Sequence, residues 1–313
     1  MIFETEAGLK KAYAKVNSLE EIESVENKAK ECDIIEITTD NALIDFESRR
    51  YFFVPRKVTY KLVAPQSEED YLMLLKKKKR KSIIKSANFC KEEGIEIKTE
   101  EPISRETFLE WEKIYDANIA RKKIGIKRID LGRFLSVQHK TAGIFAYKDN
   151  KLIGGIMLMH KKFLMDGELH RKISISLSSS ERDYFKTGIN EVLNFEVIKF
   201  CQRRGIKFIE RGMDANLYGH YLNPGLYVFK KSMGYRITFK PKYGFCWRKI
   251  INFEKFDKNI FFISIGDKDL EGNLFFRGDM PNIKDYKSPH LRKINIFSIN
   301  DNVAVKVKKL IVN

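Results

Sequence analysis

The chain has 313 residues, of which 43% are hydrophobic and 12% aromatic, and it carries a formal net charge of +17 at pH 7. This content is enough for the packed core of one large domain or two smaller lobes, and it excludes an intrinsically disordered protein. The longest apolar runs, such as residues 260–265, are far shorter than the ~20 residues that cross a bilayer, and residues 1–11 lack the apolar region of a signal peptide. We therefore expect a cytoplasmic protein.

The positive charge is unevenly distributed along the chain. Residues 1–65 contain ten Lys and Arg against twelve Asp and Glu, a net charge of −2, so residues 66–313 carry an excess of +19. A surface with such an excess concentrates anions, which favours a polyanionic ligand such as RNA, a nucleotide, coenzyme A or an anionic lipid head group. The alternative is a general enrichment in Lys and Ile with no ligand behind it.

The first part of the chain predicts a small α/β unit followed by two helices. Residues 6–31 show short helical patterns, and the β-branched and aromatic runs at 33–46 and 51–63 predict strands. The spacing of apolar residues predicts a helix over 68–94 and a second helix that begins after Ser104.

From residue 142 the pattern changes to that of a sheet with a crossover helix. Two apolar runs joined by Asp149 and Asn150 predict a β-hairpin. The elements that follow are a strand, a long helix, a strand, the stretch NPGLYVFKKSMGYRI and an aromatic-rich strand, at residues 172–179, 189–204, 206–214, 223–237 and 239–250. The last sixty residues have short apolar runs and predict a β-rich extension.

Neither the cysteines nor the histidines show the spacing of a metal site or a disulfide framework. The four cysteines lack a C-x-x-C pair and are expected to be small buried residues: Cys32, Cys90, Cys201 and Cys246. The five histidines are scattered along the chain: His139, His160, His170, His220 and His290. No H-E-x-x-H, P-loop or G-x-S-x-G motif occurs, so the sequence predicts no metal and no catalytic triad.

The segment LSSSERDYFKTGIN, residues 177–190, joins a predicted strand to the start of the long helix. The N–H groups and the dipole at a helix start favour an anionic group such as a pyrophosphate, and Gly188 lets the backbone approach it closely. The other expected phosphate ligands of this turn are Arg182, Lys186, Thr187 and Asn190. The alternative is an ordinary helix start, since many helices begin with Thr-Gly and bind nothing.

The run KKKKRK, residues 76–81, lies within the first predicted helix. Six consecutive cations cannot share one helix face, so some point to solvent while others can line a groove for phosphates. The predicted polyanion contacts are Lys77, Lys78, Arg80 and Lys81. The alternative is a solvated face without a ligand.

Four segments in the same order resemble the Fem-type aminoacyl transferases and their acetyltransferase relatives, within the GNAT superfamily of N-acyltransferases. They are YLMLLKKKKRKSIIKSANFCKEEGIEI, FAYKDNKLIGGIML, INEVLNFEVIKFCQRRGIKFIERG and GLYVFKKSMGY, at residues 71–97, 145–158, 189–212 and 225–235. The resemblance implies an α+β fold of two GNAT-like lobes, each a mixed β-sheet flanked by helices. The implied boundaries are residues 1–140 for a degenerate N-terminal lobe, 141–250 for the acyltransferase lobe and 251–313 for a β-rich extension, which in Fem-type proteins returns to the first lobe.

The sequence departs from this family at the donor site. GNAT proteins that bind acetyl-CoA carry Arg/Gln-x-x-Gly-x-Gly/Ala, whereas this chain keeps only Gly188 and has Asn190 at the second small position. Fem-type enzymes that use aminoacyl-tRNA also have an altered loop. The resemblance therefore implies acyl-CoA (acetyl-CoA) or aminoacyl-tRNA as co-substrate, with no tightly bound cofactor, and leaves both donors open.

The closing motif GLYVFKKSMGY implies the catalytic residues. Its Phe-Lys pair corresponds to Phe229 and Lys230, with Lys230 stabilising developing negative charge or a phosphate. Phe229 and the neighbouring Lys231 are the candidates there for binding the donor or its phosphate. If this pair lies on a strand, only one of the two lysines faces the site, and the alternative for Lys230 is a solvated strand lysine. Glu210 and Asp214 flank the end of the central strand and are the candidates for the general base.

The leading hypothesis is an N-acyltransferase that moves an acetyl or aminoacyl group to an amino group of a sugar nucleotide, an envelope precursor or a peptide-like metabolite. Its expected partners include this amine-bearing acceptor, a tRNA and, peripherally, an anionic membrane. The alternative is a non-catalytic RNA- or nucleotide-binding module on the same fold, and a third option is a degenerate structural partner of another acyltransferase.

Overall fold

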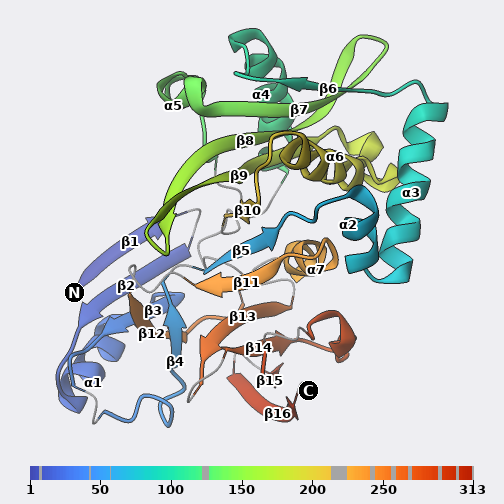
Figure 1. Cartoon of the computed structure of the whole chain (residues 1–313). Helices are drawn as coiled ribbons and strands as arrows, with labels where there is room; N and C mark the ends of the chain where they lie inside the picture. The colour runs from blue at the N-terminus through green and yellow to red at the C-terminus, as the bar shows by residue number, and fades with distance from the viewer. Residues whose placement is uncertain are drawn as a thin grey trace. The chain divides into compact units, whose positions relative to one another are not determined.

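A computed structural model of the chain describes residues 1–6, 9–41, 44–56, 58–121, 127–212, 224–239, 244–254, 259–266, 270–287, 291–300 and 303–311. The chain divides into two compact units, whose elements are labelled in Figure 1. The central unit consists of Thr59–Gly212 and Ser232–Arg236, and the terminal unit of Met1–Val58, Met213–Lys231 and Ile237–Asn313. The family lobes expected to end at residues 140 and 250 stay a prediction.

A seven-stranded mixed sheet with the strand order β11-β5-β10-β9-β8-β7-β6 is the framework of the central unit, which includes only Arg236 of the edge strand β11. The strands are β5 (Val58–Val63), β6 (Glu96–Glu100), β7 (Thr141–Lys148), β8 (Lys151–Met165), β9 (Glu168–Ser180), β10 (Phe208–Arg211) and β11 (Arg236–Phe239). The pair β9 and β10 is parallel, whereas β10–β5, β9–β8, β8–β7 and β7–β6 are antiparallel. The predicted hairpin is confirmed as β7–β8, and Asp149 and Asn150 have the positive φ values (51° and 60°) of a type I′ turn.

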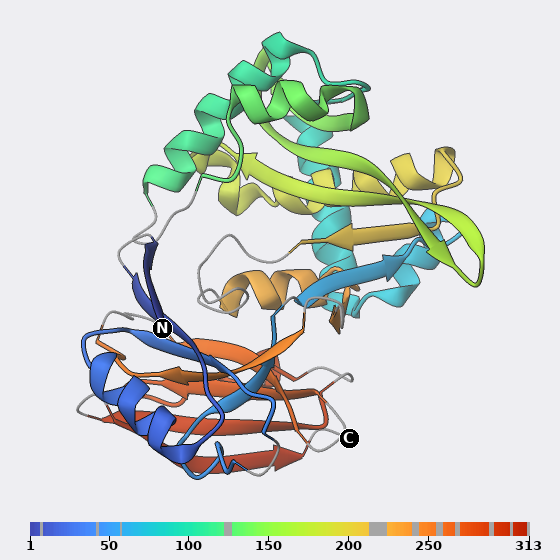
Figure 2. The ribbon, with the colours of Figure 1, turned by 90° about the vertical axis from the view of Figure 1, so that its left-hand side faces the viewer.

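Helices flank this sheet, so the prediction of an α+β fold with mixed sheets flanked by helices is confirmed (Figures 1 and 2). They are α2 (Glu68–Leu74), α3 (Lys77–Glu92), α4 (Arg105–Ala120), α5 (Leu131–Val137) and α6 (Ile189–Arg203), with the 3-10 turns η1 (Gln138–Lys140) and η2 (Arg182–Thr187). The predicted N-cap is confirmed, because the Ser104 side chain accepts a hydrogen bond from the backbone of Thr107.

The helix predicted over residues 68–94 is divided in two. Leu75 separates α2 from α3 with an extended backbone (ψ 152°), and its side chain is 4% exposed. Burying Leu75 in this conformation interrupts the helical hydrogen bonds, and α3 then starts afresh at Lys77 within the lysine run. The spacing of apolar residues does not reveal such a break, because it results from tertiary packing.

Helices α4 and α6 cover opposite faces of the sheet near the C-terminal end of β9. Asn118 of α4 donates to the hydroxyl of Ser179 (2.7 Å), whereas Asn190 of α6 donates to the hydroxyl of the next residue, Ser180 (3.1 Å). Successive side chains of a strand point to opposite faces, which places the two helices on either side of β9. On the α4 face, Trp111 donates to the carbonyl of Gly155.

The terminal unit contains two sheets, with strand orders β1-β2-β3-β12-β4 and β13-β14-β15-β16. The first comprises β1 (Ile2–Glu6), β2 (Leu9–Lys15), β3 (Ile34–Thr38), β4 (Phe52–Pro55) and β12 (Phe245–Ile250), and the second β13 (Ile260–Ile265), β14 (Leu270–Phe276), β15 (Lys293–Asn300) and β16 (Val303–Ile311). Its helices are α1 (Leu19–Lys28) and α7 (Pro224–Ser232), with the 3-10 turn η4 (Ile283–Asp285). The prediction of a β-rich extension is confirmed by β13–β16.

The interpretation of residues 6–31 as short helical patterns is right for α1 and wrong for residues 9–15. The segment LKKAYAK forms β2, which pairs antiparallel with β1 and parallel with β3. The backbone of Lys10 donates to the carboxylate of Asp33 at 2.7 Å, which fixes β2 beside the start of β3. Strand pairing with distant residues therefore overrides the weak local pattern.

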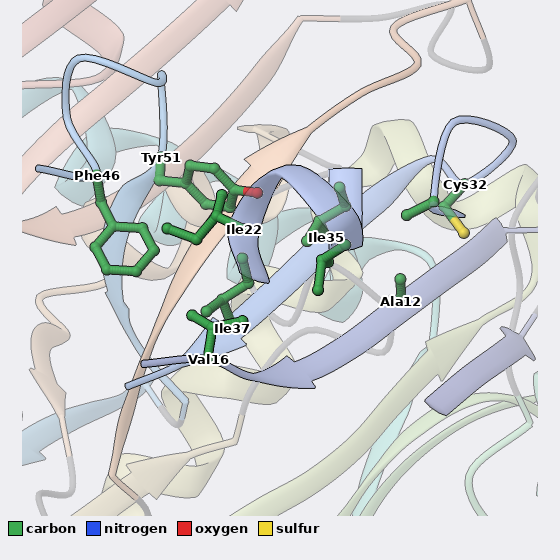
Figure 3. Close-up of a cluster of buried hydrophobic side chains, with 10 residues drawn as sticks. Ala12, Val16, Ile22, Cys32, Ile35, Ile37, Phe46 and Tyr51 are labelled. Carbon is green, nitrogen blue, oxygen red and sulfur yellow. The ribbon is translucent and has the colours of Figure 1, made fainter. Parts of the chain in front are cut away.

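The hydrophobic core of the first terminal sheet lies under α1. Figure 3 shows Ile22 of this helix above Ile35 and Ile37 of β3, with Phe46 and Tyr51 closing one end of the cluster. Each of these five side chains is at most 2% exposed. The helix α1 therefore joins this sheet by burying its apolar face, as expected for an amphipathic helix.

All four cysteines are buried and free, as predicted. Burial raises the pKa of Cys201 to about 12 and the pKa values of Cys90 and Cys246 to about 11. These thiols therefore stay protonated near neutral pH and are poor nucleophiles. No group of His, Cys, Asp and Glu in the described ranges could hold a metal ion. Among the helices described, none is long and apolar enough to cross a bilayer.

A buried ion pair connects β3 to β12 in the terminal unit. Two guanidinium nitrogens of Arg248 lie 2.7 and 2.9 Å from the same carboxylate oxygen of Glu36, and the amine of Lys11 is 4.0 Å away. Burial acts to raise the pKa of Glu36, but the charges of Arg248 and Lys11 outweigh it and lower the pKa. Because the carboxylate is favoured in the folded protein, Glu36 stabilises the fold above its unfolded pKa, and this contribution is lost as the pH falls through the folded pKa.

We expect Glu36→Gln to lower the free energy of unfolding by about 3 kcal/mol at pH 7, because it leaves Arg248 buried without its counter-charge. The difference from the wild type should shrink in acid below pH 4.5, the ordinary pKa of a glutamate. Urea denaturation at pH 7 and pH 3.5 measures both, with the exposed Glu4→Gln as control. Equal midpoints for the two variants at pH 7 would contradict a stabilising pair.

Candidate active site

The candidate site lies at the C-terminal end of β9, where the sheet of the central unit opens. In the described part of the chain β9 is paired with β10 as far as Ile175 and Arg211, yet β9 continues to Ser180. The edge of β9 that pairs with β10 up to Ile175 therefore has no β10 partner over residues 176–180. Main-chain groups on such an edge can bind a ligand that takes the place of the missing strand.

A β-bulge lies where the pairing ends. On β8, the consecutive residues Met157 and Leu158 pair with Leu177 and Ile175 of β9, so Ser176 is the extra residue. Ile175 shares the α6 face with its register partner Arg211, which contacts α6, whereas Leu177 packs against the cluster beneath α4. The bulge therefore reverses which face the following side chains occupy, as bulges next to functional sites often do.

The turn between β9 and α6 brings the helix start to this opening. Gly188 precedes α6 with φ 82°, a left-handed conformation that favours glycine. A Cβ atom on Gly188 would lie 2.0 Å from the hydroxyl of Ser86 on α3, so a second, steric reason excludes a side chain. Helix α3 thus packs directly on the turn that the sequence indicated as a phosphate-binding site (Figure 1).

The expected phosphate ligands of the turn differ in their availability. Arg182 and Lys186 are exposed on η2, where they can meet an anion in solvent. Thr187 donates its hydroxyl to the carbonyl of Tyr184 at 2.8 Å, and Asn190 donates to Ser180, so both side chains hold the turn together. Two cations and the backbone at Gly188 are therefore what the turn offers to a phosphate.

The lysine run packs on this turn through one of its members. The amine of Lys79 lies 2.6 Å from the carboxylate of Glu191 in the first turn of α6. A carboxylate at this position competes with an anionic ligand for the helix dipole, and Lys79 neutralises it. Of the predicted polyanion contacts, Lys77, Lys78 and Lys81 are exposed, whereas Arg80 is half-buried and donates to the sulfur of Met73.

A chain of polar side chains runs behind the opening on the α6 face. Arg211, at the end of β10, donates to the side-chain oxygen of Asn194, and the amide of Asn194 donates to the backbone of Asn190 at 2.6 Å. Arg211 also lies over the ring of Tyr235, 5.4 Å from its centre. Arg211 and Asn194 are 6% and 1% exposed, so the end of β10 is fixed to α6 by buried hydrogen bonds.

Glu210 is held by an ion pair in the described structure. It is 5% exposed on β10, and its carboxylate binds the amine of Lys172 on β9. Glu210 is in register with Ser174, two residues before the bulge, so this carboxylate lies close to the open strand edge. The other predicted base, Asp214, lies outside the described residues.

The closing motif forms helix α7 rather than a strand. Lys230 is 3% exposed, whereas Lys231 is half-buried, donates to the carbonyl of Lys287 at 2.8 Å and lies over the ring of Tyr227. On a helix three consecutive residues point about 100° apart, so Phe229 and the two lysines present different faces. These residues belong to the terminal unit, and Glu210 belongs to the central unit. The proposed roles of the three stay predictions.

Several residues around the opening were not found from the sequence. They are Lys79, Asn118, Lys172, Glu191, Asn194 and Arg211. The one available signal is the spacing of Asn190 and Asn194, i and i+4, which places both amides on one side of the helix near its apolar positions, where polar residues need partners.

No family model matches the sequence, and no curated protein matches it. Solved structures with a similar fold include FemX, which is 13% identical with a TM-score of 0.45 over 78% of this chain and 82% of that chain. The L-PGS of Bacillus licheniformis is 15% identical, with a TM-score of 0.43 over 80% of each chain. An aminoglycoside acetyltransferase from a soil metagenomic sample, in complex with sisomicin, is 13% identical, with a TM-score of 0.34 over 40% of this chain and 80% of that chain. Function is therefore inferred from the geometry of β9, β10 and α6.

We expect Gly188→Ala to destabilise the central unit more than Gly205→Ala, at the other end of α6. Both glycines have a positive φ, but a Cβ on Gly205 would meet nothing within 4 Å. The backbone cost is about 1 kcal/mol for each alanine, and the overlap with Ser86 adds about 2 kcal/mol at Gly188. Thermal or urea unfolding measures the difference, and Ser86→Gly should restore part of the loss in the double variant. Equal destabilisation by the two alanines would contradict close packing of α3 on the turn.

Proposed function

We propose that this protein is an N-acyltransferase that uses the open edge of β9 as its acyl-transfer site. The observation that carries the proposal is the end of the β9–β10 pairing at Ile175 and Arg211, next to the bulge at Ser176 and the N-terminus of α6. Acyl transfer needs hydrogen-bond donors for the oxyanion of the tetrahedral intermediate and a fixed position for the donor. An uncovered strand edge beside an anion-binding helix start can supply both.

The main-chain N–H groups on the uncovered side of β9, between Ser176 and Ser180, are our candidates for binding the acyl carbonyl. They are fixed in place because β9 stays paired with β8 along this stretch, so they need no reorganisation as charge develops. The attacking amine loses its proton as the new C–N bond forms, and the leaving thiolate or ribose oxygen receives a proton. No side chain is required to act as the nucleophile in this scheme.

Glu210 is our candidate for accepting the proton of the amine, directly or through water. Its ion pair with Lys172 offsets the cost of burying the carboxylate and fixes its orientation. Asp214 remains a second candidate from the sequence. For Lys230, which belongs to the terminal unit, the low exposure supports a fixed role rather than that of a solvated lysine, and its part in stabilising negative charge stays a prediction from the closing motif.

Among the two donors, we favour aminoacyl-tRNA over acyl-CoA. The exposed cations Lys77, Lys78 and Lys81 lie on the helix that packs against the Gly188 turn, which extends the basic surface beyond what one pyrophosphate needs. Such a surface suits a polyanion. For the acceptor, we propose an amino group of a sugar nucleotide, an envelope precursor or a peptide-like metabolite. The same exposed lysines also support the second candidate, a non-catalytic RNA-binding module.

Calorimetry with charged tRNA and with acetyl-CoA, each at 50 and 200 mM salt, tests the donor. We expect charged tRNA to bind with a steep salt dependence, since each phosphate contact releases counterions. The double variant Lys77→Ala and Lys78→Ala should weaken this binding about tenfold and reduce the salt slope by about 2. Lys161 and Lys162, on the hairpin arm of β8, give a matched control pair of lysines.

Binding of acetyl-CoA alone, with little salt dependence, would assign the donor to acyl-CoA and leave the transferase proposal intact. If the folded protein bound neither donor, the transferase proposal would be contradicted.

We expect Glu210→Gln to lower turnover by at least about a hundredfold while the dissociation constant of the donor stays unchanged, because the amide cannot accept the proton. The control is Glu181→Gln. Glu181 follows β9, and its carboxylate pairs with Lys151 at the start of β8. Turnover is measured as transfer from the bound donor to a panel of amino-sugar and peptide acceptors, and unfolding is measured for both variants. Equal turnover in the two folded variants would exclude Glu210 as the base. A folded wild type that binds tRNA but transfers to no acceptor would favour the binding module.

A further inference from the structure

The terminal unit contains a cavity of about 560 Å³ that includes none of the residues assigned to acyl transfer. Its walls come from β4 and the residues before it, from the end of β12 and the residues after it, and from the β13–β16 sheet. Small-molecule sites typically have volumes of ~300–1,000 Å³. The cavity is therefore large enough for a ligand of the size of a monosaccharide or larger.

One end of the cavity is aromatic and the other is polar. At the aromatic end, Phe275 and Phe297 are stacked with ring centres 4.5 Å apart, and Phe52 meets both edge-on. At the polar end, Asn273 of β14 and Asn295 of β15 stand opposite each other in the strand register. Both asparagines are at most 6% exposed. The same face of one sheet thus changes from phenylalanine to buried amides along the strands.

The polar residues form one continuous hydrogen-bonded row across three strands. Lys293 contacts one oxygen of Glu271 at 2.5 Å, and the amide nitrogen of Asn295 donates to the other oxygen at 3.1 Å. The same nitrogen donates to the side-chain oxygen of Asn273 at 3.1 Å, and Asn273 donates to the hydroxyl of Ser264 at 2.7 Å. All five side chains line the cavity, and Lys293 and Glu271 form their ion pair there.

The carboxylate of Glu271 determines how the side-chain amides of Asn295 and Asn273 are oriented. An ionised Glu271 only accepts hydrogen bonds, so Asn295 must present its nitrogen to it, and its second N–H then fixes the orientation of Asn273. Among the described residues, this arrangement leaves the side-chain oxygen of Asn295 buried and without a hydrogen-bond partner. A buried acceptor without a partner is costly, and such groups are rare in folded proteins. A ligand donor that reaches this oxygen as the side chains of the row adjust would satisfy it.

The charges at the polar end favour a neutral donor on the ligand. Lys293 already neutralises Glu271, so no net negative charge remains to attract an ammonium group. A hydroxyl group can donate to Asn295 and also accept from Ser264 or Lys293, whereas an ammonium group can only donate. The carboxylate of Glu271 packs directly against Gly266, because a Cβ there would lie 1.8 Å from its oxygen.

The exposed lining residues of the cavity carry a positive excess. Arg50 and Lys306 are exposed cations, and Glu47 is an exposed acid. Lys249 also lines the cavity, but Glu26 holds its amine at 2.8 Å. The two cations can bind an anionic substituent of a ligand that extends out of the cavity.

We propose that this cavity binds a small polyhydroxyl compound of monosaccharide size that carries a phosphate group. Its hydroxyl groups bind Asn295, Ser264 and Lys293, the apolar face of its ring packs on the phenylalanines, and its phosphate lies near Arg50 and Lys306. This is a binding site of the terminal unit, and its occupancy is independent of the proposed acyl transfer.

The experiment is calorimetry and thermal unfolding of the full chain with glucose 6-phosphate, glucose and inorganic phosphate, each up to 10 mM. We expect glucose 6-phosphate to bind one to one and to raise the melting temperature, and the other two to bind at least tenfold more weakly. Asn295→Ala should weaken glucose and glucose 6-phosphate by about tenfold, since it removes the acceptor. Asn300→Ala, on the exposed end of the same strand, is the control for any effect on folding.

A second pair of variants separates the phosphate from the sugar and leaves the buried row intact. Lys306→Ala should weaken glucose 6-phosphate several-fold and leave glucose unchanged, whereas Lys308→Ala, exposed on the same strand but outside the cavity, should change neither. No binding of any probe to the folded protein would overturn the proposal. It would also be overturned if inorganic phosphate bound as tightly as glucose 6-phosphate, because the ligand would then be an anion on the surface.

Discussion

The parallel pairing of β9 with β10 is the constraint on which the central unit depends. Parallel neighbours cannot be joined by a tight turn, so the chain must leave the C-terminal end of β9, cross the sheet as α6 and return to begin β10 beside it. The crossover places the N-terminus of α6 next to Ser180, where β9 extends beyond its partner. A helix start and a strand end without a β10 partner therefore lie together because of one topological requirement, as at the ligand-binding strand ends of other sheets.

Two local features fix the geometry of this junction. The bulge at Ser176 reverses the faces of the last residues of β9, so Ser179 binds α4 and Ser180 binds α6. The left-handed Gly188 allows α3 to pack on the turn and brings Lys79 to Glu191. Both features fix the backbone at the junction, and a fixed backbone is what electrostatic stabilisation of a transition state requires.

The features that the sequence predicts are those set by a few neighbouring residues. The hairpin at Asp149, the cap at Ser104 and the strand-to-helix junction at Gly188 follow from turn and capping preferences of a few neighbouring residues. The bulge at Ser176 depends on the register of β8, and the ion pair of Glu210 depends on a residue 38 positions away. Such features cannot be found without knowing which strands pair, because no local pattern encodes the partner.

Each unit contains a buried row of hydrogen-bonded polar side chains, but the two rows join different elements. In the central unit Arg211 and Asn194 are used to join β10 to α6, so their hydrogen bonds contribute to the position of the candidate active site. In the terminal unit the row from Lys293 to Ser264 joins strands that are already paired through their backbones. A sheet face that needed only cohesion could continue with phenylalanine, as it does at Phe275 and Phe297. The polar groups there, with the oxygen of Asn295 unpaired among the described residues, are what a ligand of the proposed kind would explain.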